Sequence, residues 1–331
     1  MRTRKASLPD PHYPGLSPRA YEHPADRAMS AALQRIPVLD RVLRTLASLQ
    51  YERSLRQRLL GNAVRIDDDQ LPAVHASHLA ALHTLDHEPA PELYVGQHPW
   101  ANAVTIGIDR PVTVLHSALL RTLDERQLRA VLAHEAAHVQ SRHVLYRTSL
   151  AVLLTVSLQR LPALGEATRR ALILVLTEWA RASELSCDRA AVLAVRDPIV
   201  VCGALMQLAA GDVEDLSVEA FVRQAEGFRD DGGPLSRGVR FLQEVDATHP
   251  WSVRRVTEVV DWVRSGAYDR IASGDYVRRG AEPPVTAEAK GAIDHYRTLV
   301  ADLLEEAGLG LRQLTSTLRD WLRRAGEAAA E

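Results

Sequence analysis

The chain has 331 residues, of which 46% are hydrophobic and 25% are charged, and its formal net charge at pH 7 is −2. This length and apolar content suffice for the core of one large domain or somewhat more, and they predict a globular protein. The nearly balanced charge excludes the broad basic field typical of nucleic-acid binding, so we expect no nucleic-acid partner. Two cysteines, Cys187 and Cys202, are too few for a disulfide framework, and reduced thiols are expected.

The first 24 residues predict an extended, proline-rich arm, which either wraps the domain that follows or covers its cleft. Its basic start is followed by Pro9, Pro11, Pro14 and Pro18 without an apolar run, which does not fit a secretory signal. Residues 25–60 then predict helices interrupted at Pro37. We interpret the arginines of this region as a solvated face, with peripheral contact to an anionic membrane as the alternative. These features favour a cytoplasmic location.

Two β-like runs follow a helix expected over residues 71–88. The β-branched residues Val104, Thr105 and Ile106 form the first run, and residues 112–115 form the second. Residues 109–111, which include a proline, separate them. A small sheet is therefore expected beside many helices.

Residues 124–139 predict a helix that carries a metal-binding motif. Asp124 is an N-cap candidate, and apolar residues recur after it at helical spacing. Inside the helix, residues 134–138 read His-Glu-x-x-His. Positions four apart share a face, so His134 and His138 can bind one metal at about 2.0 Å each, and Glu135 can take a proton from a water whose pKa zinc lowers from about 15.7 to about 7. The motif predicts a zinc peptidase, against the alternative of a solvated helix face.

A further helix over residues 179–191 offers the third metal ligand. Residues 144–158 and 171–179 predict a buried helical hairpin that leads to it, and its longest apolar run covers about nine residues against about 20 for a transmembrane span. Glu184 and Asp188 share a face of the further helix. Because catalytic zinc uses three protein ligands, Glu184 is the candidate ligand, and Asp188 can accept a hydrogen bond from a liganding histidine. The alternative is an exposed acidic pair, and Cys187 between them is interpreted as packing.

The C-terminal part predicts a separate unit. A helix ends near residue 267, a turn-rich stretch follows, and apolar residues between Ile293 and Leu322 recur at spacings of three and four. Such a stripe needs a partner surface, which is the preceding domain or, alternatively, self-association or another protein. The predicted organisation is an arm over residues 1–24, a domain over residues 25–268, and a linker with an amphipathic helix over residues 269–331.

These motifs together resemble a known family. They are His134-Glu135-x-x-His138 with Arg142-His143, Glu184-x-x-x-Asp188-Arg189, Asn102-Ala103-Val104-Thr105-Ile106-Gly107, and Thr248-His249-Pro250 with Arg255. In order and spacing they resemble the HtpX-like and CAAX-prenyl-endopeptidase-like family of gluzincin zinc metallopeptidases over about residues 24–255. The resemblance implies an α+β, mostly helical fold whose small sheet has an edge strand over the zinc-binding helix.

The resemblance also implies roles for single residues. One Zn²⁺ per chain would be held by His134, His138 and Glu184, with Glu135 as general base and Asp188 orienting a ligand. His249 and Arg255 would lie near the metal and stabilise the oxyanion of the tetrahedral intermediate. The main chain of the edge strand would bind an extended peptide through residues Asn102, Ala103, Val104 and Thr105.

The predicted function is a zinc-dependent endopeptidase acting on peptides or unfolded proteins, in protein quality control by family resemblance. One alternative is a non-catalytic, zinc-stabilised binding or chaperone-like module. Retention of Glu135 argues against it, because a structural zinc has no use for a general base. The other alternative is hydrolysis of a non-peptide amide.

Overall fold

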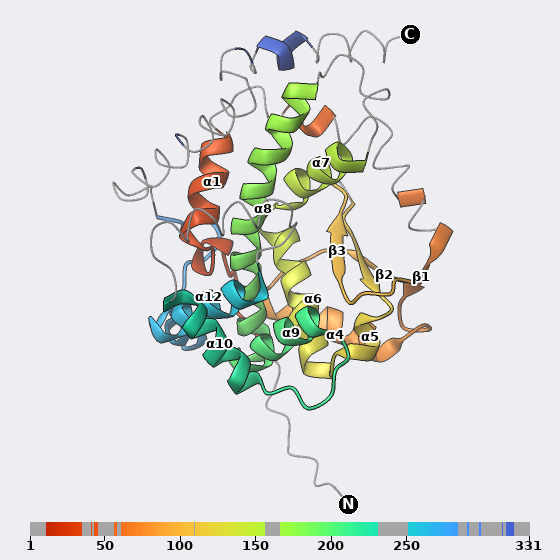
Figure 1. Ribbon diagram of the computed structural model, residues 1–331, viewed down its shortest axis with the longest axis vertical. Helices are drawn as coiled ribbons and strands as arrows, with labels where there is room; N and C mark the ends of the chain where they lie inside the picture. Colours follow the sequence, from red (N-terminus) through yellow and green to blue (C-terminus); the bar gives the residue numbers. More distant parts are fainter. Residues whose placement is uncertain are drawn as a thin grey trace, which may run out of the picture.

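The structure, a computed structural model, describes residues 11–34, 41, 43–45, 56–57, 61–108, 110–155, 166–230, 251–283, 290, 298, 313 and 316–320. Its longer helices are α1 (Pro24–Gln34), α4 (Pro72–Thr84), α6 (Glu125–Gln140), α7 (Val144–Thr155), α8 (Glu166–Val195), α9 (Pro198–Ala210), α10 (Val218–Asp230) and α12 (Ser252–Arg264). Short helices are η1 (Pro18–Ala20), α5 (Leu119–Thr122) and α13 (Ala267–Ala272). Figure 1 shows α8 running through the middle of the molecule, between α1 on one side and α6 and the sheet on the other.

The sheet has four strands in the order β1-β2-β4-β3, namely β1 (Ala63–Ile66), β2 (Glu92–Gly96), β4 (Val112–His116) and β3 (Ala103–Ile106). β2 and β4 are parallel, and the other two pairs are antiparallel. β3 forms an edge of this sheet and lies against α6. The predicted α+β, mostly helical fold with an edge strand over the motif helix is confirmed, whereas β1 and β2 were not predicted.

A capping box and close packing against α8 fix the position of helix α6. Asp124 caps it as predicted, because its side chain accepts a hydrogen bond from the backbone N–H of Gln127 while Gln127 returns one to the Asp124 backbone. Small residues let α6 approach α8 closely, and both Ala136 and Ala137 are buried there with Ala190. The His-Glu-x-x-His motif therefore lies inside the molecule rather than on a solvated face.

Helix α8 is a single helix of 30 residues. It joins the predicted segments 171–179 and 179–191 without interruption, because no glycine or proline stands between residues 166 and 195 to break it. Trp179 in its middle is fully buried. α8 thus connects the region beside α7 and α1 with the helices α9 and α12 at its other end.

The described part of the N-terminal arm packs onto the domain. Tyr13, Leu16 and Tyr21 are buried in the core. The backbone N–H of Tyr13 donates to the carbonyl of Thr84, and Leu16 forms a β-bridge with Arg278. Residues 11–23 thereby wrap the domain, while the predicted boundaries of the three units stay predictions.

Much of the predicted C-terminal unit lies outside the described residues. The same holds for residues 1–10 of the arm and for most of the basic region between residues 35 and 60. Within the ranges that the structure describes, no helix combines the length and the apolar content needed to cross a membrane.

Candidate metal centre

The His-Glu-x-x-His segment turns all three of its functional side chains into the molecule. His134 is 7% exposed, Glu135 is 3% exposed and His138 is fully buried. On α8, Glu184 and Asp188 are equally buried and face them. Their burial rules out the two alternatives considered from the sequence, a solvated helix face for the motif and an exposed acidic pair on α8.

The donor groups of three residues lie at similar distances from one another. Nε2 of His134 lies 3.2 Å from Nε2 of His138 and 3.3 Å from Oε2 of Glu184, and Nε2 of His138 lies 3.3 Å from the other oxygen of that carboxylate, Oε1. A tetrahedral zinc ion with ligand bonds of about 2.0–2.1 Å separates its ligands by about 3.3–3.4 Å. The spacing and the two-imidazole, one-carboxylate chemistry therefore fit a zinc ion.

Cys187 offers an alternative third donor. Its sulfur and ring nitrogens of His134 and His138 all lie within 4.8 Å of one another. Burial, together with the negative charge of Glu184, raises the pKa of the Cys187 thiol well above its usual value. Glu184 is the preferred third ligand, because its carboxylate oxygens lie 3.3 Å from Nε2 of both histidines and two imidazoles with one carboxylate are a usual catalytic zinc set.

Asp188 and Arg255 support His134 on the Nδ1 side of its ring. Oδ1 of Asp188 lies 3.1 Å from Nδ1 of His134, so it can accept the ring N–H and leave Nε2 free for a metal. Arg255 from α12 donates from Nε to Oδ2 of Asp188 at 2.8 Å and from Nη2 to Oδ1 at 2.6 Å. Burial disfavours the charged forms of both Asp188 and His134. The cation of Arg255 nevertheless lowers the pKa of Asp188. The carboxylates of Glu184 and Asp188 raise the pKa of His134 to about 9.

The edge strand reaches Glu135 through one side chain. Thr105 is fully buried, and its hydroxyl donates a hydrogen bond of 2.7 Å to Oε2 of Glu135. Asn102 and Ala103 line a cavity of about 40 Å³ together with His134 and Glu135. Glu184, Asp188 and Arg255 also line it, and the remaining lining is apolar, from Ala130, Val131, Ala191, Val201, Ala204, Leu205 and Leu208. Val104 points to the other face of the strand, where it packs near Tyr94, so only three of the four predicted substrate-binding residues come near the site by their side chains.

Arg147 on α7 is a site residue that sequence reasoning missed. Its Nη1 forms an ion pair with Glu184 and lies 3.0 Å from Nε2 of His138. Nε2 of an imidazole has a single lone pair, so Arg147 and a metal are alternative partners of that atom. Arg147 lies nine positions after His138 and beyond the end of α6, so no local spacing pattern links the two residues.

The predicted site residues are thus largely brought together. Arg255 lies near the metal donors, with its Nη1 3.6 Å from Oε2 of Glu184. His249 lies outside the described residues.

Comparisons with known proteins identify the family of the chain. The profile of peptidase family M48 matches residues 68–263. The chain is 35% identical over 257 residues to the plastoglobule-localized metallopeptidase 48, chloroplastic, of Arabidopsis thaliana, across 76% of the chain and 74% of that relative. It is 26% identical over 234 residues to protease HtpX homologs of Burkholderia mallei and Burkholderia pseudomallei, across 63% of the chain and 80% of those relatives. No solved structure gives a significant match.

Proposed function

The chain belongs to peptidase family M48 and is a metallopeptidase, and on this premise we propose that it is a zinc-dependent endopeptidase. In this proposal His134, His138 and Glu184 hold one zinc ion, and Glu135 is the general base. The observation that carries the proposal is the grouping of His134, His138 and Glu184 beside the buried carboxylate of Glu135. The two Nε2 atoms lie 3.2 Å apart, and each lies 3.3 Å from one oxygen of Glu184. We propose zinc rather than another metal because this spacing matches tetrahedral coordination.

The protein side chains divide the chemistry among them. A zinc ion bound there would supply a Lewis acid and make water a stronger nucleophile near neutral pH. Glu135 accepts the proton of the attacking water and delivers it to the leaving amine. Thr105 orients that carboxylate by its hydrogen bond to Oε2, and Asp188 holds His134 in the tautomer that presents Nε2. Arg255 is proposed to stabilise the oxyanion, and His249 shares this role by resemblance alone.

The substrate proposed is an extended segment of a peptide or an unfolded protein. Strand β3 is at the edge of the described sheet and ends beside Glu135, so its main chain can pair with an extended chain, to which residues 102–105 would contribute. Main-chain pairing selects for extension more than for sequence, which is the basis for proposing a role in protein quality control. The predicted cytoplasmic location, peripheral membrane contact and self-association through the C-terminal unit stay predictions.

The test compares purified wild type with Glu135→Gln, each with its zinc content measured, in the cleavage of casein. We expect the variant to keep its zinc and to lose cleavage by about 10²–10⁴-fold, the usual contribution of a general base. Glu184→Ala serves as the contrasting variant, because it should lose zinc. Equal zinc loss in both variants would overturn the role assignment. A zinc-loaded wild type that leaves casein intact and hydrolyses a simple amide would favour the non-peptide alternative.

A further inference from the structure

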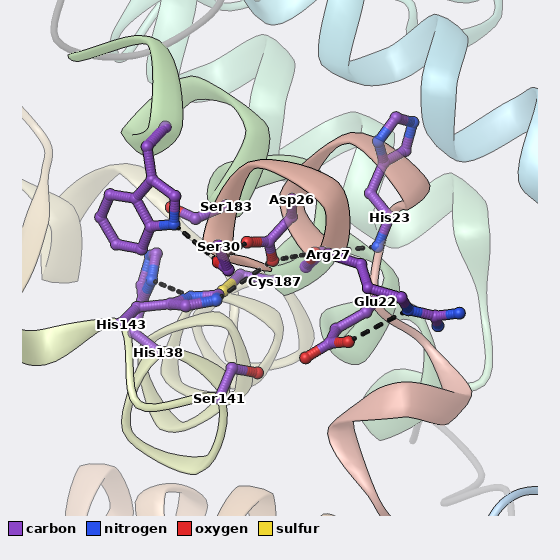
Figure 2. Close-up of polar contacts among 12 residues, drawn as sticks. Glu22, His23, Asp26, Arg27, Ser30, His138, Ser141, His143, Ser183 and Cys187 are labelled. Atoms are coloured by element: carbon purple, nitrogen blue, oxygen red, sulfur yellow. Dashed lines mark hydrogen bonds and ion pairs between the residues drawn. The ribbon is translucent and has the colours of Figure 1, made fainter. Parts of the chain in front are cut away.

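A second line of buried side chains starts at His138 and leads away from Asp188, toward α1. Nδ1 of His138 lies 3.1 Å from Nδ1 of His143, and Nε2 of His143 lies 3.1 Å from Oδ2 of Asp26 (Figure 2). All three side chains are at most 3% exposed. They connect a candidate metal ligand with a carboxylate on α1, which lies outside the residues matched to the peptidase family.

The turn after α6 places His143 beside His138. Arg142 has a φ of 58°, in the left-handed region, and this reverses the chain at the helix end. The backbone N–H of His143 then donates to the carbonyl of His138 at 2.9 Å, and that of Arg142 donates to Val139, the pair of bonds that defines a Schellman motif. The ring of His143 also packs edge-on against Trp179, with centroids 5.4 Å apart. Backbone and packing together fix the imidazole.

Asp26 is held as firmly as the histidine. The hydroxyl of Ser30 donates to Oδ1 of Asp26 at 3.1 Å (Figure 2). That of Ser186 donates to Oδ2 at 2.6 Å. Burial disfavours the carboxylate, but His143 and the two hydroxyls lower the pKa of Asp26 below its usual value. A buried anion with three donors is an acceptor prepared for the N–H of His143.

When His138 is a metal ligand, only one placement of protons allows both hydrogen bonds of the chain His138–His143–Asp26 to form. Nε2 of His138 faces the other donors, so its neutral ring carries the proton on Nδ1. That N–H needs an acceptor, which is the bare Nδ1 of His143. His143 then carries its own proton on Nε2 and donates it to Asp26.

We propose that His143 and Asp26 are positioning residues that set the tautomer and ring orientation of His138, and that α1 is thereby a part of the metal centre. The inference rests on the proposed function in one respect, since it takes His138 as a metal ligand. Partners of metal-bound histidines contribute about 10–100-fold to metal affinity. Asp26 acts through His143 and touches neither metal nor substrate.

The first experiment measures the zinc affinity of the full chain by competition with a chelator. We expect Asp26→Ala to bind zinc at least 10-fold more weakly than wild type, and Asp26→Asn to lie between them, because its amide oxygen still accepts a hydrogen bond but carries no charge. Glu22→Gln is the matched control. Glu22 is another carboxylate just before α1, and its ion pairs are with Arg19 and Arg27. The control should stay within twofold of wild type.

The second experiment reads the tautomers directly. In long-range ¹H–¹⁵N spectra of the zinc-loaded protein, we expect His138 to be protonated on Nδ1 and His143 on Nε2. A purely structural role for Asp26 predicts normal zinc affinity in any folded variant, and Asp26→Asn, which keeps the shape of the side chain, supplies that variant. A proton on Nδ1 of His143, or unchanged affinity in folded Asp26→Asn and Asp26→Ala, would overturn the proposal.

These readouts separate the two levels of inference. A wild type that binds no zinc at micromolar concentration overturns the proposed function. A wild type that binds zinc while the Asp26 variants bind it equally well overturns the positioning role alone. Neither measurement depends on cleavage of a substrate.

Discussion

His134 and His138 belong to the same motif on the same helix, yet they are held in different ways. The Nδ1 side of His134 contacts a charged pair, Asp188 from α8 with Arg255 from α12. The Nδ1 side of His138 contacts a second imidazole, that of His143, whose carboxylate partner comes from α1. The first network lies inside the family-matched residues 68–263, and the second extends beyond them.

The pKa values of the two histidines move in opposite directions. Burial lowers both, but the carboxylates of Glu184 and Asp188 raise the pKa of His134 to about 9. The nearby cation of Arg147 adds to burial and lowers the pKa of His138 well below its usual value. The two histidines of one motif are therefore not equivalent, because their surroundings decide how each imidazole is charged and oriented.

The largest effect should come from the charged network. Asp188→Asn removes the anion to which the buried guanidinium of Arg255 donates two hydrogen bonds and leaves it only the longer contact with Glu184. We therefore expect the free energy of unfolding to fall by about 3–5 kcal/mol. Asp26→Asn, whose partners are a histidine and two hydroxyls, should cost less, about 1–2 kcal/mol. Chemical denaturation of the metal-free proteins measures both. The reverse order would break the comparison.

A double variant sharpens that test. Asp188→Asn combined with Arg255→Gln removes both charges, and should recover part of the lost unfolding free energy without restoring zinc affinity. Recovery of zinc affinity as well would mean that Asp188 acts on folding alone.

The third motif residue, Glu135, is held by the sheet rather than by either network. Thr105→Val keeps the shape of the side chain but removes the hydrogen bond to Oε2 of Glu135. We expect kcat for a peptide substrate to fall about 10-fold, because one charge-assisted hydrogen bond is worth about 1.5–3 kcal/mol and only part of it acts on the rate. Zinc affinity should not change, and a matching loss of zinc would contradict the separation between base and ligands.

The arm that leads into α1 has its own anchor at Asp86, which accepts hydrogen bonds from the backbone N–H of Gly15 and from Arg279. These bonds lower the pKa of Asp86 although burial opposes this. A lowered pKa stabilises the folded chain above the unfolded value of about 3.9, and the stabilisation is lost as the pH falls through the lower folded value. Asp86→Asn should therefore cost about 1 kcal/mol at pH 7, and nothing in strong acid, since the carboxylate is partly exposed. Thermal unfolding at several pH values measures this, and an equal cost at low and neutral pH would refute it.

The smallest expected effect is the coupling between the two networks. Asp26→Asn and Asp188→Asn act on different ligands through groups that share no partner. Their effects on the free energy of zinc binding should add to within about 0.5 kcal/mol. A larger deviation in the double variant would show that the two supports form one network.

Local patterns allowed much of the centre to be predicted. The N-cap at Asp124, the spacing of the motif and the shared face of Glu184 and Asp188 are properties of single helices, and they appear in the structure as expected. β3 was predicted from its β-branched residues. β1 and β2 were missed because, unlike β3 and β4, they contain no consecutive β-branched residues.

Contacts between distant segments could not be predicted in this way. Asp26 reads in the sequence as an acidic residue in the first turn of a helix, which is normally solvated, and nothing near it indicates a partner at His143. Arg147 is missed for the same reason. These residues become meaningful only when α1, α7 and α8 pack together around α6.

The connection from α1 to His138 has a thermodynamic consequence that runs both ways. If the docking of α1 strengthens zinc binding by a given factor, zinc must strengthen the docking of α1 by the same factor. The amide hydrogens of α1 would then exchange with solvent more slowly in the zinc-loaded protein than in the metal-free one. The N-terminal helix would in this way report whether the metal is present.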